Sequence, residues 1–432
     1  MTLNRGVLAR IGGAVVALGL LGSSFIIPAK AAQTHSPAVT ITVWTAYNGQ
    51  QAKTFNDLIS KFQAKNPSIQ VNMVSSANYG ALLQKETSAV LSGSTPTIGQ
   101  AYEEWTQGFV NSGAVQELSS YINGKQGLSK KDIADFFPKV WKDGLLGKKR
   151  YMMPFSKSDL VLYFDGPMLR KYGIKSPPST WTQFAADAKK VTKITNGHLD
   201  QWGMSWVVDE SAFYAWQYEW GNKVLNSHGN AAFGNSAGVK PIQFFANLTN
   251  HKYMQVLSCS CFQDEADFLN GKTAFAMGSI AGLPFYTCCA KSGVGVGVTK
   301  LPAGPKGRYT ELYGAPFVMF KKASAAEKNA GWLFLKFITG TPQEAEWSET
   351  TGYIPIRKSE VKLMKTFLNQ HPQERAAYES LPFALLEPYR LGWTKARNDL
   401  GSYIAAALTG SKAPAQAMKE AAAQVNSDLK AS

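Results

Sequence analysis

One short segment of the chain matches a motif that carries nucleophilic chemistry in serine hydrolases. Residues 234–238 read GNSAG, which fits the pattern G-x-S-x-G and makes Ser236 a candidate nucleophile. That motif needs a buried strand before the serine, whereas the polar residues 227–230 precede it here. A suitably placed histidine partner is also missing, so we interpret Ser236 as a helix cap. An exported hydrolase that uses Ser236 or a carboxylate pair stays a rival hypothesis.

Phosphate-loop and metal chemistry are poorly supported by the remaining motifs. Residues 271–273 (GKT) resemble the end of a phosphate-binding loop, but Ala266 stands where its first glycine is required. The five histidines are scattered without metal-ligand spacing, and we expect neither a metal nor a cofactor. Asp264, Glu265 and Asp267 could bind calcium or act as acid and base, and we interpret them as a solvated helix face.

Four cysteines form two clusters, Cys259 with Cys261 and Cys288 with Cys289. In an exported chain an even number of cysteines favours disulfides, and we predict at least one bond between the two clusters. A soft-metal site and free thiols are the alternatives.

Aromatic residues crowd one segment: Trp202, Trp206, Tyr214, Trp216 and Trp220. Such rings can stack on sugars, but core packing explains most of them. We keep Trp206 as a candidate at the border of a ligand site.

The N-terminal residues and the charge balance bear on location and partners. Residues 1–31 combine basic residues, an apolar run over 11–27 and the small-x-small sequence AKA at 29–31, which is typical of a cleaved signal peptide. We therefore expect export to the periplasm or the extracytoplasmic cell surface. The formal net charge of +15 favours an anionic partner. The basic residues are dispersed, so we expect no nucleic-acid binding.

The elements that must position a site alternate between strand and helix. Period-two alternation predicts strands over 39–44 and 69–74, and apolar residues in helical phase predict helices over 51–65 and 79–91. A further strand is expected over 97–102. This order predicts an α/β fold with a parallel sheet, whose ligands lie beyond the carboxyl ends of the strands.

Several segments, taken in order, resemble the extracellular solute-binding proteins of ATP-binding-cassette importers. They are 164–174 (FDGPMLRKYGI), 179–184 (STWTQF), 268–278 (FLNGKTAFAMG), 332–337 (WLFLKF) and 351–356 (TGYIPI). The resemblance covers nearly the whole chain after residue 31. It implies a two-lobed, periplasmic-binding-protein-like fold of type II, in which each lobe is a mostly parallel sheet flanked by helices and a hinge joins the lobes.

The same resemblance implies the division of the chain and its role. The first lobe would hold 38–160 and 314–357, and the second lobe 161–313 and 358–432. The protein would be a monomer without catalytic activity that hands a small molecule to a membrane permease.

Within this family the chain is most similar to members that bind glycerol 3-phosphate, notably over 347–359 (WSETTGYIPIRKS) and 387–393 (EPYRLGW). The resemblance implies seven ligand-site residues: Tyr79, Glu103, Ser158, Ser279, Gly314, Tyr353 and Arg390. A phosphate suits Arg390, the hydroxyls and the Gly314 amide because all of them donate hydrogen bonds. The glycerol hydroxyls of a phosphomonoester or a glycerophosphodiester suit Glu103 and Tyr79. A sugar or oligosaccharide is the alternative ligand.

Overall fold

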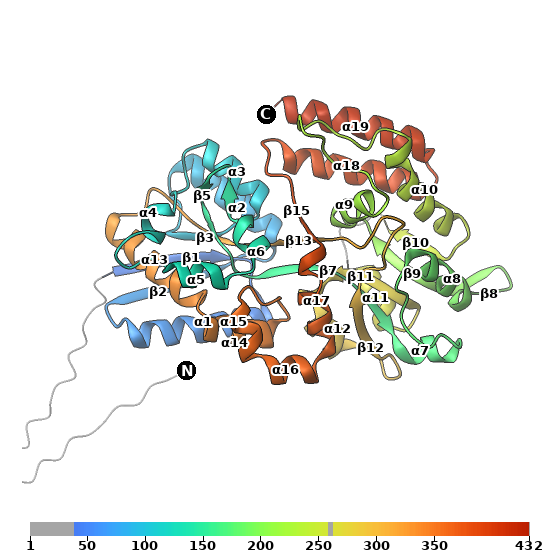
Figure 1. Ribbon diagram of the computed structural model, residues 1–432, viewed down its shortest axis with the longest axis horizontal. Helices are drawn as coiled ribbons and strands as arrows, with labels where there is room; N and C mark the ends of the chain where they lie inside the picture. The colour runs from blue at the N-terminus through green and yellow to red at the C-terminus, as the bar shows by residue number, and fades with distance from the viewer. Residues whose placement is uncertain (1–38, 258–261, 432) are drawn as a thin grey trace, which may run out of the picture. The chain divides into compact units, whose positions relative to one another are not determined.

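The computed structural model describes residues 39–257 and 262–431. Within these residues two β-sheets, each accompanied by helices, build the two lobes of an α/β fold (Figure 1). The expected two-lobed fold is therefore confirmed. None of the described helices is both long enough and apolar enough to cross a membrane. The expected signal peptide lies outside the described residues.

The first sheet has the strand order β2-β1-β3-β14-β6. Its strands are β1 (Val39–Thr45), β2 (Ile69–Ser75), β3 (Ile98–Gln100), β6 (Met152–Met153) and β14 (Phe317–Met319). β1 runs parallel to both of its neighbours, as the β-α-β-α-β order predicts, whereas β14 runs antiparallel to β3 and β6. Ile41, Val43 and Thr45 are buried in alternation, which is the pattern of a strand with one covered face.

The second sheet has the order β10-β9-β11-β7-β13-β15, with β8 paired to β9 and β12 paired to β7. Its strands are β7 (Lys157–Asp165), β8 (Lys193–Thr195), β9 (His198–Val207), β10 (Met254–Leu257), β11 (Thr273–Ser279), β12 (Val296–Lys300), β13 (Thr310–Gly314) and β15 (Ala384–Leu386). β7 runs antiparallel to β11, β12 and β13. A small separate ribbon pairs β4 (Leu145–Leu146) with β5 (Lys149–Arg150).

Both sheets are mixed, so the expectation of mostly parallel sheets was wrong. The physical reason lies in the connections. β7 and β14 each follow a short crossing from one sheet to the other, at 154–156 and 315–316, and not a strand-helix-strand unit. A strand-helix-strand unit places its two strands parallel, whereas a short crossing between sheets does not. β7 belongs to the second sheet from Lys157 on, whereas the expected limit of the first lobe was residue 160.

Helices cover both sheets, and Figure 1 shows α1 to α6 with α13 on one side and α7 to α11 with α18 and α19 on the other. The first group, with α14, is α1 (Gly49–Lys65), α2 (Tyr79–Ser92), α3 (Glu103–Asn111), α4 (Ser119–Ile122), α5 (Lys130–Asp135), α6 (Pro138–Asp143), α13 (Ala325–Ile338) and α14 (Thr341–Thr351). The second group, with α12, is α7 (Gly166–Lys171), α8 (Trp181–Val191), α9 (Glu210–Glu219), α10 (Ser236–Asn250), α11 (Gln263–Leu269), α12 (Leu283–Cys289), α18 (Trp393–Leu408) and α19 (Pro414–Lys430). The connecting helices are α15 (Lys358–Leu363), α16 (Lys365–Gln370) and α17 (Pro372–Tyr378), with the 3-10 turns η1 (Ile280–Gly282) and η2 (Leu381–Phe383).

Aromatic side chains fill the core beside each sheet. The first core is centred on Phe55, Phe155, Phe317 and Trp347, and the second on Trp181, Trp216 and Phe245. In the second core the rings of Trp216 and Phe245 stack with centroids 3.7 Å apart. Trp206 is 1% exposed and its ring lies 5.1 Å from that of Trp216. Its burial is that of a core residue.

Candidate functional site

Two of the expected site residues meet through their phenol groups on the side of the first sheet. Tyr79 is the first residue of α2, which the Asn78 side chain caps by accepting from the N–H of Ala81. Tyr353 follows the left-handed Gly352 that ends α14. The hydroxyl oxygens of Tyr79 and Tyr353 lie 3.3 Å apart. The structure therefore brings together two residues that are distant in sequence.

A second pair of expected residues lies in the second sheet. Ser158 is the second residue of β7 and Ser279 is the last residue of β11, and their Oγ atoms are 2.6 Å apart. The N–H of Ala281 donates to Ser279 Oγ at 3.2 Å. Two hydroxyls and a backbone N–H thus converge, which is a group of donors and acceptors that can bind oxygen atoms of a ligand.

Two further tyrosines lie beside these pairs, and neither was predicted as a site residue from the sequence. Tyr102 immediately precedes α3 and Tyr313 lies in β13. Burial raises the pKa of Tyr102 most, and nearby Tyr353, Glu104 and Tyr313 raise it further. Burial raises the pKa of Tyr313 most, and a side-chain hydrogen bond with Ser279 opposes the rise. The only sequence signal was their position directly before Glu103 and Gly314.

We call these six residues the hydroxyl cluster: Tyr79, Tyr102, Ser158, Ser279, Tyr313 and Tyr353. Burial raises the pKa of all four phenols above the ordinary value. The phenols therefore stay protonated at neutral pH and can donate hydrogen bonds.

Gly314 follows Tyr313 of the hydroxyl cluster, and the surrounding backbone requires a glycine at this position. Its φ is +131°, and a Cβ built on it would lie 2.1 Å from the carbonyl oxygen of Ser156. Gly314 pairs with Lys157 across β13 and β7. Glycine is required here because the backbone of β7 approaches too closely for a side chain.

Glu103 lies close to the hydroxyl cluster, but its carboxylate already accepts a hydrogen bond from Lys157. The side chain is 2% exposed, and its Oε1 accepts a hydrogen bond from Lys157 Nζ at 2.6 Å. Burial raises the pKa of Glu103 well above the ordinary value, with Asp143 adding to the rise and Lys157 opposing it. Lys157 was not singled out in the sequence, where an isolated lysine is most often a solvated residue.

Arg390 lies on the segment between β15 and α18 and points to a different neighbour. Its Nη1 donates to the carbonyl oxygen of Gly229 at 2.5 Å, in the loop between α9 and α10. Among the described residues, no hydrogen bond joins Arg390 to Ser158 or Ser279. The structure thus assembles the tyrosines and serines of the expected set directly, and leaves Arg390 at a separate contact.

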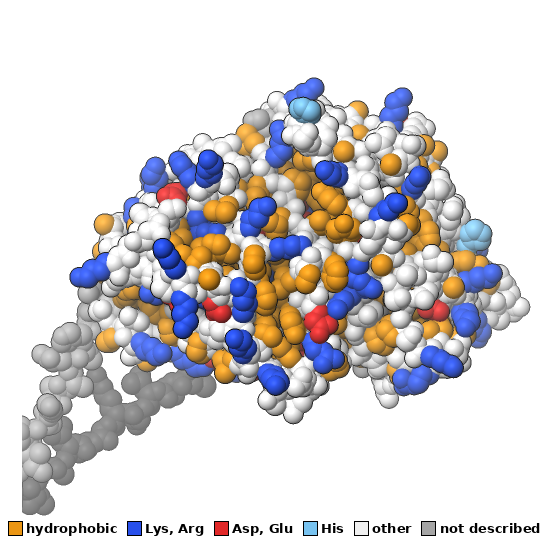
Figure 2. Space-filling view, viewed as in Figure 1, with side chains coloured by type: hydrophobic (Ala, Val, Ile, Leu, Met, Phe, Trp, Pro, Cys, Tyr) orange, Lys and Arg blue, Asp and Glu red, His pale blue; other side chains and the backbone are white. Residues whose placement is uncertain are grey.

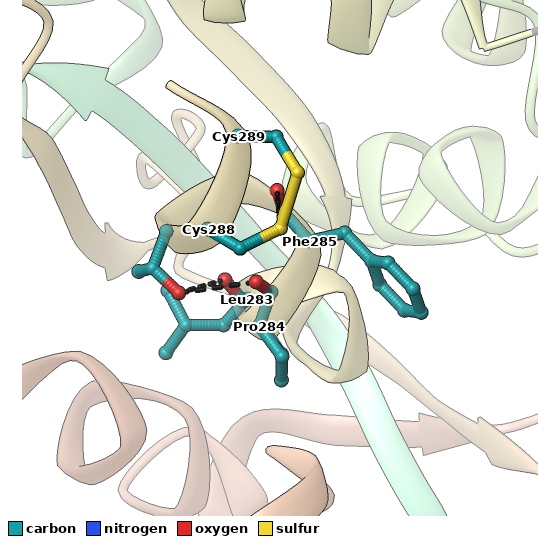
Figure 3. The surroundings of a disulfide bond; sticks show 6 residues. Leu283, Pro284, Phe285, Cys288 and Cys289 are labelled. Carbon is teal, nitrogen blue, oxygen red and sulfur yellow. Dashed lines mark hydrogen bonds between the residues drawn. A yellow bond between two sulfur atoms is a disulfide. The ribbon is translucent and has the colours of Figure 1, made fainter. Parts of the chain in front are cut away.

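The cysteines pair differently from the expectation. Cys288 and Cys289 form a disulfide with each other at the C-terminal end of α12 (Figure 3). Neither sulfur is then available for a bond to the other cluster, so the predicted bond between clusters was wrong. Adjacent cysteines at a helix end can form a disulfide without any other segment of the chain. Cys259 and Cys261 lie outside the described residues.

The interpretation of Ser236 as a helix cap was wrong by one residue. Ser236 is the first residue of α10, and the cap is Asn235, whose side chain accepts from the N–H groups of Ala237 and Gly238. The acidic run on α11 is not simply a solvated face, since Asp267 is 4% exposed and accepts from Ser205 Oγ at 2.7 Å. Asp264 accepts from the N–H of Val207. No group of three or more metal-ligating side chains occurs in the part of the chain that the structure describes.

Comparisons with known sequences give relatives that align over nearly the full chain. The family described as bacterial extracellular solute-binding protein matches residues 57–373. A binding protein of Brucella abortus (strain 2308) is 25% identical over 95% of this chain and 97% of its own. The sn-glycerol-3-phosphate-binding periplasmic protein UgpB of Yersinia pseudotuberculosis serotype I is 28% identical over 89% of this chain and 91% of its own.

Solved structures show the same fold. UgpB from Mycobacterium tuberculosis, in complex with glycerophosphocholine, matches with a TM-score of 0.81 and 19% identity over 91% of this chain and 98% of that one. The GacH receptor of Streptomyces glaucescens GLA.O, solved unliganded and with acarbose, matches with a TM-score of 0.80 and 18% identity over 91% and 99% of the two chains.

Proposed function

The chain belongs to the bacterial extracellular solute-binding proteins, and from this premise we propose that its ligand is sn-glycerol 3-phosphate or a glycerophosphodiester. Members of this family are the substrate-binding components of ATP-binding-cassette importers and act outside the cytoplasm. This chain is such a component and has the same location. We also propose which residues bind this ligand, and that the protein delivers the ligand to one membrane permease.

The hydroxyl cluster is the observation that carries the proposal. Ser158 Oγ, Ser279 Oγ and the N–H of Ala281 converge within hydrogen-bond distance of one another, and the protonated phenols lie beside them. Phosphate oxygens accept hydrogen bonds from such donors, and each hydroxyl can also accept from the hydroxyls of glycerol. A ligand with both groups uses both capacities of the same cluster.

Arg390 supplies the charge in this proposal. A guanidinium group has five N–H donors, and the structure shows one of them bound, to Gly229. We assign the first lobe to 39–156 and 315–357 and the second to 157–314 and 358–431, with a hinge at the two crossings, because β7 and β13 belong to the second sheet. Closure of the lobes around a ligand favours the form that docks on the permease.

The surface charge supports capture of an anion. Lysine and arginine total 45 residues against 30 acidic ones, and Figure 2 shows them spread over the visible face without one dominant patch. A positive field of this kind speeds the encounter with an anionic solute. The relatives agree in chemistry, because the Yersinia protein is a glycerol-3-phosphate-binding protein and the Mycobacterium structure holds glycerophosphocholine.

A sugar is the second candidate, and one observation favours it. The rings of Tyr102 and Tyr79 lie 4.9 Å apart, and the Trp105 ring lies 4.8 Å from that of Tyr102. Aromatic groups of this kind can cover the apolar face of a sugar ring. The GacH receptor, which has the same fold, binds acarbose.

A thermal-shift screen followed by calorimetric titration separates the two candidates. We expect sn-glycerol 3-phosphate or glycerophosphocholine to raise the melting temperature, and maltose and glucose to leave it unchanged. A ligand at 100 times its Kd stabilises the folded chain by about 2.7 kcal/mol. A shift with neutral sugars alone would remove the phosphate-ester proposal and leave the transport role.

A further inference from the structure

Lys157 occupies the point where the chain enters the second sheet, and its side chain is 0% exposed. Its Nζ lies 2.6 Å from Glu103 Oε1 and also contacts Asp143 Oδ2. Glu103 begins α3 and Asp143 ends α6, both of which accompany the first sheet, whereas Lys157 begins β7 of the second. One buried ion-pair network therefore joins the two lobes.

The Lys157 ammonium group is the counter-charge of two buried carboxylates, and the buried Arg150 guanidinium adds a second positive charge near Asp143. A buried charge without a partner would be costly. Burial lowers the pKa of Lys157, but Asp143 and Glu103 outweigh it and raise the pKa above the ordinary value, so the ammonium persists. The raised pKa of Glu103 means that this carboxyl takes up a proton more readily than an exposed glutamate, and Lys157 Nζ also contacts Asp143 Oδ2.

The network also reaches the neighbours of the expected ligand residues. The Tyr389 hydroxyl donates to Asp143 Oδ1, which anchors the residue directly before Arg390. The N–H of Ile354, directly after Tyr353, donates to the carbonyl oxygen of Lys157 at 2.8 Å.

Two more site residues depend on the backbone of Lys157. Gly314 is its partner across the two strands, and Ser158 is its successor in β7. Lys157 thus connects, by its side chain or its backbone, to the surroundings of Arg390, Tyr353, Gly314 and Ser158.

We propose that Lys157 is a positioning residue that holds the two halves of the ligand site in register, and that Glu103 is its counter-ion and not an acceptor for ligand hydroxyls. This inference rests on the proposed function for its ligand. It differs from the role that the family resemblance implied for Glu103.

Two single variants distinguish the two roles of Glu103. Glu103→Gln leaves Lys157 paired one to one with Asp143, so we expect its affinity for sn-glycerol 3-phosphate to stay within about threefold of the parent. Lys157→Met leaves two carboxyls without their cation, and we expect affinity to fall about tenfold or more. A large loss in Glu103→Gln together with normal binding by Lys157→Met would overturn the inference.

If Lys157→Met does not fold, two variants that leave no carboxylate of Glu103 or Asp143 without Lys157 still test the inference. The triple variant Lys157→Met, Glu103→Gln, Asp143→Asn has no charge at these three positions, and Arg150 keeps its backbone partners Met152 and Trp141. We expect it to fold and still to bind about tenfold more weakly. Tyr389→Phe removes only the hydroxyl that anchors the Arg390 segment. It should weaken binding severalfold while the melting temperature of the ligand-free protein stays close to that of the parent. Parent-like affinity in both variants would overturn the inference.

The matched control is Glu219→Gln, which alters a buried carboxylate of the second lobe that accepts from Trp181 Nε1 at 2.6 Å. It should lower stability and leave affinity unchanged. Hydrogen exchange of the ligand-free proteins adds a readout that needs no ligand. We expect faster exchange at 353–356 and 387–392 in the triple variant and at 387–392 in Tyr389→Phe, but at neither segment in Glu219→Gln. If the parent binds no compound of the screen, the proposed function fails, and this exchange pattern alone decides the role of Lys157.

Discussion

The hydroxyl oxygens of Ser158 and Ser279 lie 2.6 Å apart although 121 positions separate the residues in the chain. The antiparallel register of β7 and β11 produces this contact, because Ser279 pairs with Leu160 and so shares a sheet face with Ser158 two residues away. The N–H of Ala281 completes the group.

Removal of either serine hydroxyl should weaken binding of the phosphate ester. We expect Ser158→Ala and Ser279→Ala each to lower affinity about tenfold, since each loses a hydrogen bond to a charged group. The double variant should lose less than the two single losses combined, because the hydroxyls bind each other and the same ligand group. Calorimetric titration measures all three. Ser60→Ala, an exposed serine of α1 that bonds only to its own helix, is the control and should bind normally.

Arg390→Ala tests whether the ligand carries a phosphate. Loss of a charge-assisted contact should cost at least about 2 kcal/mol, which is more than tenfold in affinity. A neutral sugar should bind this variant as it binds the parent. If sn-glycerol 3-phosphate binds Arg390→Ala as tightly as the parent in calorimetric titration, Arg390 is not a ligand residue and its contact with Gly229 is its whole role.

Glu86 offers a prediction about stability and pH. The side chain is 0% exposed, and both carboxyl oxygens lack a hydrogen-bond partner among the described residues. Burial raises its pKa well above the ordinary value, against the opposing effect of Lys85. The folded chain therefore binds this proton more tightly than the unfolded chain. Its contribution to stability is fully present below the unfolded pKa of about 4.3 and is lost as pH rises toward the folded pKa.

Replacement of Glu86 by an apolar side chain should remove that loss. We expect Glu86→Met to raise the free energy of unfolding at pH 7 by about 1 kcal/mol or more, and to change it little at pH 4. Urea denaturation at both pH values measures the difference. Asp57→Asn, on the exposed face of α1, should show no such dependence. A Glu86→Met protein that is less stable than the parent at pH 7 would show that the carboxylate has a stabilising partner.

The disulfide between Cys288 and Cys289 can be tested on one peptide. Trypsin cleaves after Lys272 and Lys291, so the fragment 273–291 contains both cysteines and neither Cys259 nor Cys261. After alkylation without reduction, this fragment should carry no alkyl group and should be lighter by two hydrogen atoms than its reduced form. Two alkyl groups on it, or a mass that joins it to the fragment with Cys259 and Cys261, would contradict the pairing.

The sequence by itself determined the local elements and the family. The strand over Val39–Thr45 and the helix over Tyr79–Ser92 follow from the spacing of apolar residues, which depends only on neighbours along the chain. The ordered segments that resemble solute-binding proteins then predicted the two-lobed fold. Tyr79 and Tyr353 were named as site residues on that resemblance, and the structure places their hydroxyls 3.3 Å apart.

Only the tertiary structure decided which residues come into contact and which side chains form hydrogen bonds and ion pairs. Tyr102 and Tyr313 join the hydroxyl cluster because α3 and β13 deliver them to it, and no local pattern marks them. The mixed sheets follow from crossings between the lobes, which the order of elements does not reveal. Lys157 is the clearest case. An isolated lysine is expected to be a solvated side chain. Its burial between Glu103 and Asp143 arises from the packing of β7 beside α6 and beside α3, whose Glu103 is 54 positions away in the sequence. Long-range packing sets the partner of each charge, and the chemistry of the site depends on those partners.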